Sequence, residues 1–172
     1  MAIAPQTSVS DTQGGPLEGQ LDGFVRGDLR SYKNTDTAEV PFGCLVCLDS
    51  SAEDTAAKLP TDAAIPAGVV VFSHKYAKPQ ELGDTGLKTG TEMHVLRKGT
   101  VWVHVKEAVD PGDAVRVILD ATDGQIGSFA TTSQGSGDSA VIAEACWLTS
   151  TSGAGVALLE VDFTTQAALN DD

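Results

Sequence analysis

The stretch RKGTVWVHVKEAVDPGDAVRV, residues 97–117, decides the fold. It holds two runs in which apolar and polar residues alternate, Thr100–Lys106 and Ala114–Leu119, and this period of two is typical of strands that bury one face. Between them, Asp110-Pro111-Gly112-Asp113 predicts a turn, because proline presets the backbone angle of the second turn position and glycine accepts a positive φ. The stretch therefore predicts a β-hairpin.

The alternation also predicts which side chains of the first strand face the core. Val101, Val103 and Val105 share one face, and Trp102 lies on the other, mixed face. We expect the valine face to be buried. Trp102 is then either covered by a loop of its own chain or available to a partner, because exposed indoles concentrate at interfaces.

The rest of the chain from residue 42 has the same character. Short apolar or alternating runs recur about every 8–12 residues and are separated by turn residues, which is typical of an all-β barrel or sandwich. The remaining predicted strands are Phe42–Leu48, Gly68–His74, Glu92–Arg97, Ile126–Phe129, Ala140–Leu148 and Gly155–Phe163. Only Asp54–Leu59 indicates a single helical turn. The predicted fold class is all-β, a small antiparallel β-barrel or sandwich.

The chain divides into three parts by its pattern. Residues 1–40 have little periodicity and several glycines, which predicts an extended, partly flexible N-terminal arm with a few apolar contact points. Residues 41–165 carry the predicted strands and form the β domain. Residues 166–172 are expected to be a short acidic C-terminal tail.

Composition limits the possible partners. The 172 residues carry a formal charge of −13, which argues against nucleic acid and anionic membranes, because both are bound through basic surfaces. No apolar run approaches the roughly 20 residues that a membrane-spanning helix needs. Three cysteines cannot all pair within one chain, which fits a reducing compartment.

The sequence contains no catalytic or cofactor motif. Cys44 and Cys47 match C-x-x-C, but positions three apart on a strand face opposite sides, and only Cys146 and scattered histidines remain as further ligands. We therefore expect buried thiols. No serine lies in a nucleophile-elbow context, and the aspartates near turns lack the spacing of a calcium loop. We predict no enzyme activity, no metal and no cofactor.

The order of the segments resembles the structural cement proteins of tailed bacteriophages. The similar positions span the chain from about Leu21 to Phe163. In order they are Gly23-Phe24-Val25, Asp28-Leu29, Val40-Pro41-Phe42-Gly43, Ala57-Lys58-Leu59-Pro60, Gly68-Val69-Val70-Val71, Val95-Leu96-Arg97-Lys98-Gly99-Thr100-Val101-Trp102-Val103, Gly112-Asp113-Ala114-Val115, Gly127-Ser128-Phe129, Trp147-Leu148-Thr149-Ser150 and Val156–Val161. The free thiols and the long extension 1–15 depart from the family pattern.

The resemblance implies a capsid cement or decoration protein. Such a protein is made in the host cytoplasm, binds the major capsid protein on the outer surface of the assembled virion head, and stabilises the shell. It also implies self-association on the shell, as a dimer or trimer. An arm that orders on docking would add contact area. The expected partner-binding residues are the apolar anchors Phe24, Val25, Leu29 and Tyr32, the cations Arg26, Arg30 and Lys33 that would pair with capsid acids, and Trp102.

Two alternatives from other classes stay open on the sequence alone. A virion module that binds a receptor or glycan, in a tail or fibre, would use Trp102 and the loops. A small metal or redox module would use Cys44, Cys47 and Cys146.

Overall fold

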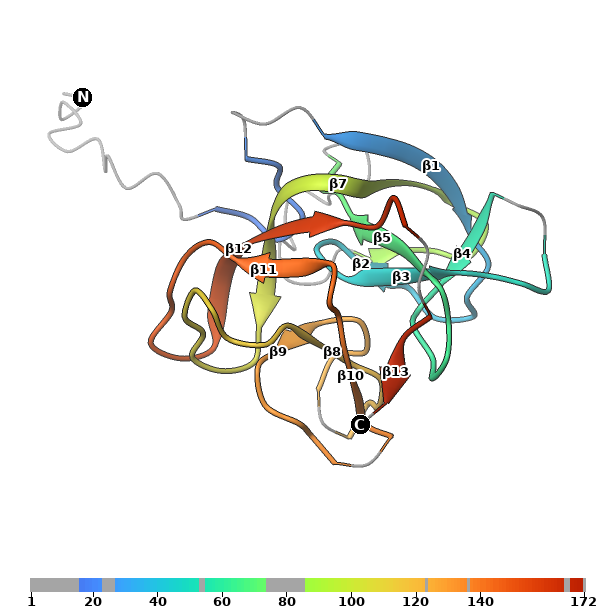
Figure 1. The fold of residues 1–172 in the computed structure, drawn as a ribbon. Helices are drawn as coiled ribbons and strands as arrows, with labels where there is room; N and C mark the ends of the chain where they lie inside the picture. The colour runs from blue at the N-terminus through green and yellow to red at the C-terminus, as the bar shows by residue number, and fades with distance from the viewer. Residues whose placement is uncertain are drawn as a thin grey trace, which may run out of the picture.

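A computed structural model describes residues 16–22, 27–52, 55–73, 86–122, 124–135, 137–165 and 168–171 of the 172-residue chain. These ranges contain only strands, turns and irregular segments, so the predicted all-β class is confirmed (Figure 1). No helix within them is long and apolar enough to cross a membrane. The strands are β1 (Asp28–Asn34), β2 (Val40–Pro41), β3 (Leu45–Leu48), β4 (Ala56–Lys58), β5 (Pro66–Val70), β6 (Gly86–Leu87), β7 (Glu92–Val105), β8 (Arg116–Ile118), β9 (Phe129–Ala130), β10 (Ser139–Val141), β11 (Ala145–Trp147), β12 (Gly155–Asp162) and β13 (Asn170–Asp171).

Five of these strands close into a ring. The pairing runs β1–β4–β3–β5–β7, and β1 pairs with β7 as well, which returns the sheet to its start. All pairs in the ring are antiparallel except β1 with β4. The result is a small β-barrel, and closure removes most of the free strand edges that an open sheet would present.

The interior of the ring is one of two hydrophobic cores. Tyr32 of β1, Val46 of β3, Val70 of β5, and Met93 and Val95 of β7 meet there, each 6 % exposed or less. The β2–β6 pair contributes two further buried residues to the same core. The barrel is therefore filled by side chains from β1 to β7, including β1.

The second core lies beside the C-terminal half of β7. β12 pairs with β7 over eight residue pairs, and β9, β8, β10 and β13 follow in order on the other side. Val101, Val103 and Val105 are all fully buried here, which confirms the predicted valine face. The alternating residues of the last long strand, 157, 159, 161 and 163, are buried against them as well.

β7 is one strand of 14 residues where the sequence predicts two. Its register against β1 shifts by one residue, because the neighbours Asp28 and Leu29 lie opposite Lys98 and Leu96. The additional residue of β7 changes the phase of the alternation, as β-bulges do. Leu96 and Val101 are five positions apart and still reach the same core. One continuous strand can therefore serve both cores.

The predicted hairpin at residues 97–117 does not form. The turn is present, since the N–H of Asp113 donates to the carbonyl of Asp110 at 3.1 Å and Gly112 has φ of 101°. However, the two strands that it follows and precedes are not paired. β9 lies between them, parallel to β7 and antiparallel to β8, while Val109 in the connection pairs with Thr151. The segment that connects β7 and β8 thus pairs with Thr151 rather than bringing these two strands together.

The described residues of the expected N-terminal arm, 16–22 and 27–40, are part of the domain. β1 lies within residues 1–40 and closes the barrel, and Gly19 exchanges backbone hydrogen bonds with Trp102 and Phe72 at 2.7 and 2.8 Å. Residues 1–15 lie outside the described residues. The segment 16–40 was expected to be extended because its glycines weaken a helix, but strand pairing with β7 and β4 supplies the order that local propensity lacks.

Two smaller expectations are corrected too. Within the predicted helical turn Asp54–Leu59, residues 56–58 form strand β4 instead, because their backbone groups pair with β1 and β3. The expected acidic tail at 166–172 contains β13, which pairs with β10, and Leu169 is buried in the second core. Pairing with distant strands decides both segments.

Candidate functional site

The first half of β1 is exposed on both of its faces. Residues 28–31 are all exposed, whereas Tyr32 and Asn34 further along the strand point into the barrel. Figure 1 shows β1 as an outer strand that runs above β7. Leu29 is 45 % exposed, the highest value among the exposed large apolar side chains of the described residues. A single exposed leucine is common on protein surfaces, so its surroundings decide its meaning.

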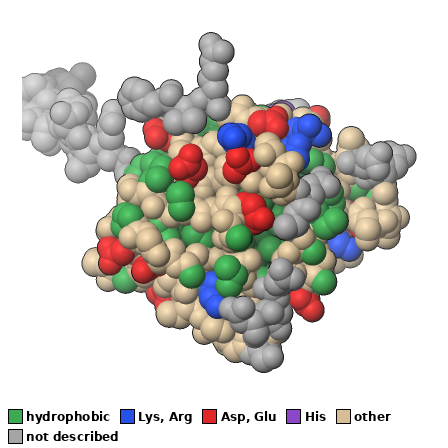
Figure 2. Space-filling model, in the orientation of Figure 1, with side chains coloured by type: hydrophobic (Ala, Val, Ile, Leu, Met, Phe, Trp, Pro, Cys, Tyr) green, Lys and Arg blue, Asp and Glu red, His purple; other side chains and the backbone are tan. Residues whose placement is uncertain are grey.

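Two exposed cations, Arg30 and Lys33, follow this leucine on the same strand. Neither side chain makes a hydrogen bond or ion pair with any residue that the structure describes. Lys98 on the neighbouring β7 is instead neutralised, because its Nζ donates to Asp162 Oδ2 at 2.6 Å. In Figure 2, Lys and Arg side chains lie beside Asp and Glu side chains over the upper part of the visible surface. We call the surface that Leu29, Arg30 and Lys33 expose on the two sides of this strand the β1 face.

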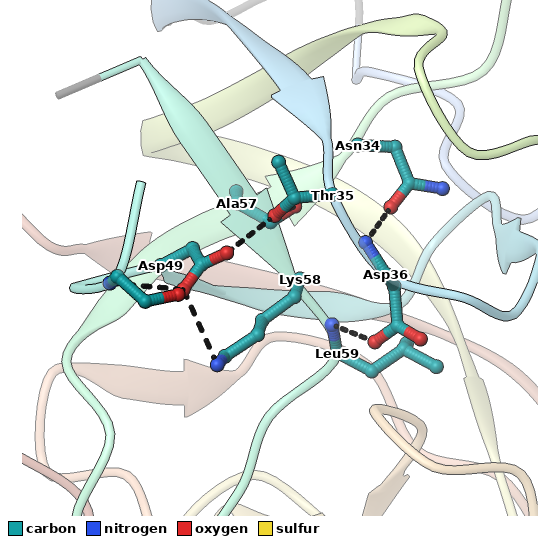
Figure 3. A network of polar contacts seen from close by, with 8 residues as sticks. Asn34, Thr35, Asp36, Asp49, Ala57, Lys58 and Leu59 are labelled. Atoms are coloured by element: carbon teal, nitrogen blue, oxygen red, sulfur yellow. Dashed lines mark hydrogen bonds and ion pairs between the residues drawn. The ribbon is translucent and has the colours of Figure 1, made fainter. Parts of the chain in front are cut away.

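A network of polar contacts fixes the end of β1 (Figure 3). Asn34 is fully buried, and its Nδ2 donates to the carbonyl of Leu87 at 2.7 Å while its Oδ1 accepts from the N–H of Asp36 at 2.8 Å. The Asp36 carboxylate then accepts from the N–H of Leu59, beyond β4, at 3.0 Å. These contacts join β1 to the β4 and β6 segments, so the end of the strand that carries the β1 face is held by hydrogen bonds to both.

Asp49 extends this network on the β3 side. It accepts hydrogen bonds from the hydroxyls of Ser51 and Thr35 at 2.7 and 2.8 Å, and Lys58 Nζ lies 3.3 Å from it. The hydrogen bonds from Ser51 and Thr35 hold the pKa of Asp49 well below the usual range. The side chain is only 9 % exposed, so its charge is compensated locally.

This network was not predicted from the sequence. Its signal is the run Asn34-Thr35-Asp36, three residues that bond local backbone groups and therefore favour strand ends and turns. The run lies within residues 1–40, the predicted extended arm, where no fixed strand end was expected. Its partners lie 14 to 53 positions away and could not be found from spacing.

The predicted anchor residues fall into three groups. Leu29, Arg30 and Lys33 lie together on the exposed β1 face. Tyr32 does not, because it is 6 % exposed and packs inside the barrel, so it is a core residue. The three predicted contacts Phe24, Val25 and Arg26 lie outside the described residues.

Trp102 is half-buried and lies away from the β1 face. Its backbone N–H donates to the carbonyl of Gln20 at 2.9 Å, and its backbone carbonyl accepts from the N–H of Gly19 at 2.7 Å. On the opposite edge it is paired with Leu158 of β12. Both edges of the strand are thus occupied at this point, and only the partly exposed indole is left for contacts beyond the chain.

The three cysteines are free thiols. Cys44 and Cys47 are buried, as predicted, and burial raises the pKa of each thiol to about 12. Cys146 is exposed, and its pKa is raised by partial burial and by Glu160. No cluster of three potential metal ligands occurs among the described residues. Thiols with raised pKa values are poor nucleophiles and poor metal ligands at neutral pH.

A cavity of about 530 Å³ lies between the segment 16–18 and the barrel. Phe42 and Phe72 form part of its wall, with ring centroids 5.2 Å apart. At its rim, His104 Nδ1 lies 3.0 Å from Glu18 Oε1, and this contact raises the pKa of His104. The ion pair and the backbone bonds of Gly19 together hold the segment against β7.

The closed barrel thus exposes on β1 one apolar side chain and two cations whose side chains have no partner in the described ranges, and mixed surfaces of this kind occur at protein interfaces. The match with a family model is more specific, because it covers residues 5–164 and is described as "Structural cement protein (E217 gp24/Pam3 gp6)". The chain therefore belongs to the phage structural cement protein family, which confirms the resemblance seen in the sequence and the role as a capsid cement protein.

A solved structure shares the fold. A chain described as "The capsid of Myoviridae Phage XM1" superposes with a TM-score of 0.66 at 17 % sequence identity, over 93 % of this chain and 98 % of that one. At this identity the likeness shows the fold. No curated protein matches the sequence.

Proposed function

We propose that the protein binds the major capsid protein on the outer surface of the assembled head through its β1 face, and that it stabilises the shell without catalysis. The observation that carries the proposal is the setting of Leu29, which lies exposed beside two cations that have no partner in the described chain. A partner surface with an apolar patch and nearby carboxylates would bury the leucine and neutralise Arg30 and Lys33.

The mechanism is the addition of contact area to a thin shell. Each copy needs only modest affinity, because contacts to more than one capsid subunit act together through effective concentration. We propose that copies also associate with one another on the shell, as dimers or trimers. The unpaired thiols of Cys44, Cys47 and Cys146 fit synthesis in the reducing host cytoplasm.

Binding to shells assembled without this protein tests the proposal. We expect the triple variant Leu29→Asp, Arg30→Glu, Lys33→Glu to bind about 30-fold more weakly in co-sedimentation, equivalent to about 2 kcal/mol from one partly buried leucine and two exposed ion pairs. The variant should unfold at the wild-type temperature, because all three side chains are exposed. Shells carrying the wild type should also resist heat better than bare shells.

Matched controls separate a local contact from a general loss of binding. Leu148 is 42 % exposed and lies on another part of the domain, so Leu148→Asp repeats the apolar-to-acidic change. Lys106→Glu repeats the charge reversal at an exposed site. Both controls should bind like the wild type. Equal binding of the triple variant and the wild type would exclude the β1 face, and failure of the wild type to bind shells would exclude the cement role itself.

A further inference from the structure

Backbone hydrogen bonds show which way the N–H and C=O groups of β1 point. The N–H of Lys33 donates to the carbonyl of Thr55, next to β4, at 2.7 Å, so this group points away from β7. The N–H of Asn34 donates to the carbonyl of Thr91 at 2.9 Å and points the other way. These directions alternate along a strand. The N–H and C=O groups of Leu29 and Ser31 therefore point away from β7, in line with Lys33.

This outer edge of β1 is free over the residues that precede Lys33. β4 pairs with β1 only at Lys33 and Asn34. No residue in the described ranges accepts from or donates to the outward backbone groups of Leu29 and Ser31, and the one side-chain contact of Ser31 is made by its hydroxyl with His94 Nδ1 of β7. Two N–H and two C=O groups on this edge thus have no partner within the described ranges, and two of them belong to Leu29, the most exposed leucine of those ranges.

We infer that an extended segment of the capsid protein adds to this edge as an extra strand, an inference that rests on the proposed function. The added strand would occupy the place alongside residues 28–31 that β4 occupies alongside 33–34. Main-chain hydrogen bonds supply affinity in this mode, and side chains on alternate faces supply specificity. Arg30 and Lys33 are three positions apart and lie on opposite faces of β1, so the segment should offer a carboxylate on each face.

Charge favours a capsid segment over a second copy of the chain as the occupant. The carboxylate that another β1 would bring is Asp28, and Arg97 Nη1 already lies 3.8 Å from it. Antiparallel pairing of two copies centred on Arg30 would place the two arginines opposite each other, which is unfavourable. Charged side chains on an edge also discourage unspecific pairing, so the free edge is protected until an acidic strand arrives.

A proline substitution tests the backbone edge separately from the side chains. Ser31→Pro removes an outward N–H and blocks an added strand, and proline is tolerated where the N–H of an edge strand faces solvent. Ser31→Ala keeps the N–H and loses the same hydroxyl contact with His94 Nδ1, at 3.3 Å, so it is the matched control. We expect Ser31→Pro to bind shells at least about tenfold more weakly and Ser31→Ala to bind normally. Normal binding of a folded Ser31→Pro would overturn strand addition while leaving capsid binding intact.

Amide hydrogen exchange keeps the inference testable if Ser31→Pro does not fold. In the free wild-type protein the amides of Leu29 and Ser31 should exchange fast, whereas those of Arg30 and Tyr32, which face β7, should be protected. On the shell, the first two should slow by about tenfold or more. Unchanged exchange of Leu29 and Ser31 on shells that have bound the protein would refute the added strand. Protection that grows with concentration in the free protein, together with a dimer in analytical ultracentrifugation, would assign the edge to a second copy and overturn the inference.

Discussion

Replacement of Asn34 by alanine tests whether the polar network at the end of β1 holds the barrel closed. The Asn34 side chain is fully buried and bridges the carbonyl of Leu87 and the N–H of Asp36 at 2.7 and 2.8 Å. Alanine would leave both groups without these partners. An unsatisfied buried group costs about 1–3 kcal/mol, and Asp36 is partly reachable by water, so we expect a total loss of about 2–4 kcal/mol.

This loss is measurable as a shift of the unfolding temperature. For a domain of this size, each kcal/mol lowers Tm by about 2–4 °C, so Asn34→Ala should unfold about 5–15 °C below the wild type in calorimetry. Thr37→Ala, at an exposed position in the same loop, is the control and should leave Tm unchanged. A shift of less than about 2 °C for Asn34→Ala would show that the network contributes nothing to the closed barrel.

A second substitution distinguishes the lost hydrogen bond from lost packing. Asn34→Asp has almost the same shape but sets a carboxylate against the carbonyl of Leu87 at neutral pH. Burial and this repulsion should raise its pKa above the unfolded value of about 3.9, so the penalty is present at pH 7 and falls as pH drops through the raised folded-state pKa. Urea unfolding at pH 7 and pH 5 should show the gap to the wild type narrowing. A gap that does not depend on pH would point to packing instead.

Four further outcomes follow from other parts of the structure. The pKa of Asp49 is lowered, so its stabilisation is present above the unfolded value of about 3.9 and lost as pH falls; the gap in unfolding free energy between wild type and Asp49→Asn should therefore shrink below about pH 4. Gly68→Ala should prevent folding or lower Tm far more than Gly90→Ala, because both glycines have positive φ but only the first would bring a Cβ within 2.2 Å of a backbone oxygen. A thiol reagent should label one site per native chain, Cys146, and three after unfolding. Deletion of residues 1–40 should abolish cooperative unfolding in circular dichroism, since it removes β1 from the closed ring; a folded truncated protein would show that β1 is dispensable.

The predictions that succeeded rest on side chains whose neighbours in sequence share their environment. Val101, Val103 and Val105 alternate with polar residues, and that period alone places them in the core. The burial of Cys47 follows in the same way from its place in an apolar run. Tyr32 was misjudged because its neighbours on β1 are polar and exposed, so no local pattern shows that its own position reaches into the barrel.

The family and the capsid role were also within reach of the sequence, because they depend on the order of motifs along the chain. The sequence predicted the β1 face only in part. Leu29, Arg30 and Lys33 were named as contact residues, but the free backbone edge beside them follows from the pairing of β1 with β7 on one side and with only two residues of β4 on the other. Whether a backbone N–H or C=O group stays unpaired depends on where the other strands lie, and the sequence of β1 does not contain this information.

The sequence by itself thus determined the all-β class, the buried faces of the long strands and the phage cement family. Only the tertiary structure decided that β1 closes a five-stranded barrel, that β9 separates β7 from β8, and that one edge of β1 has no partner strand among the described residues before Lys33. The physical reason is the range of the interactions. Alternation within a strand is set by neighbouring residues, whereas Lys33 finds its partners at Ala56 and Glu92, and the choice among distant strands is made by the packing of the whole core.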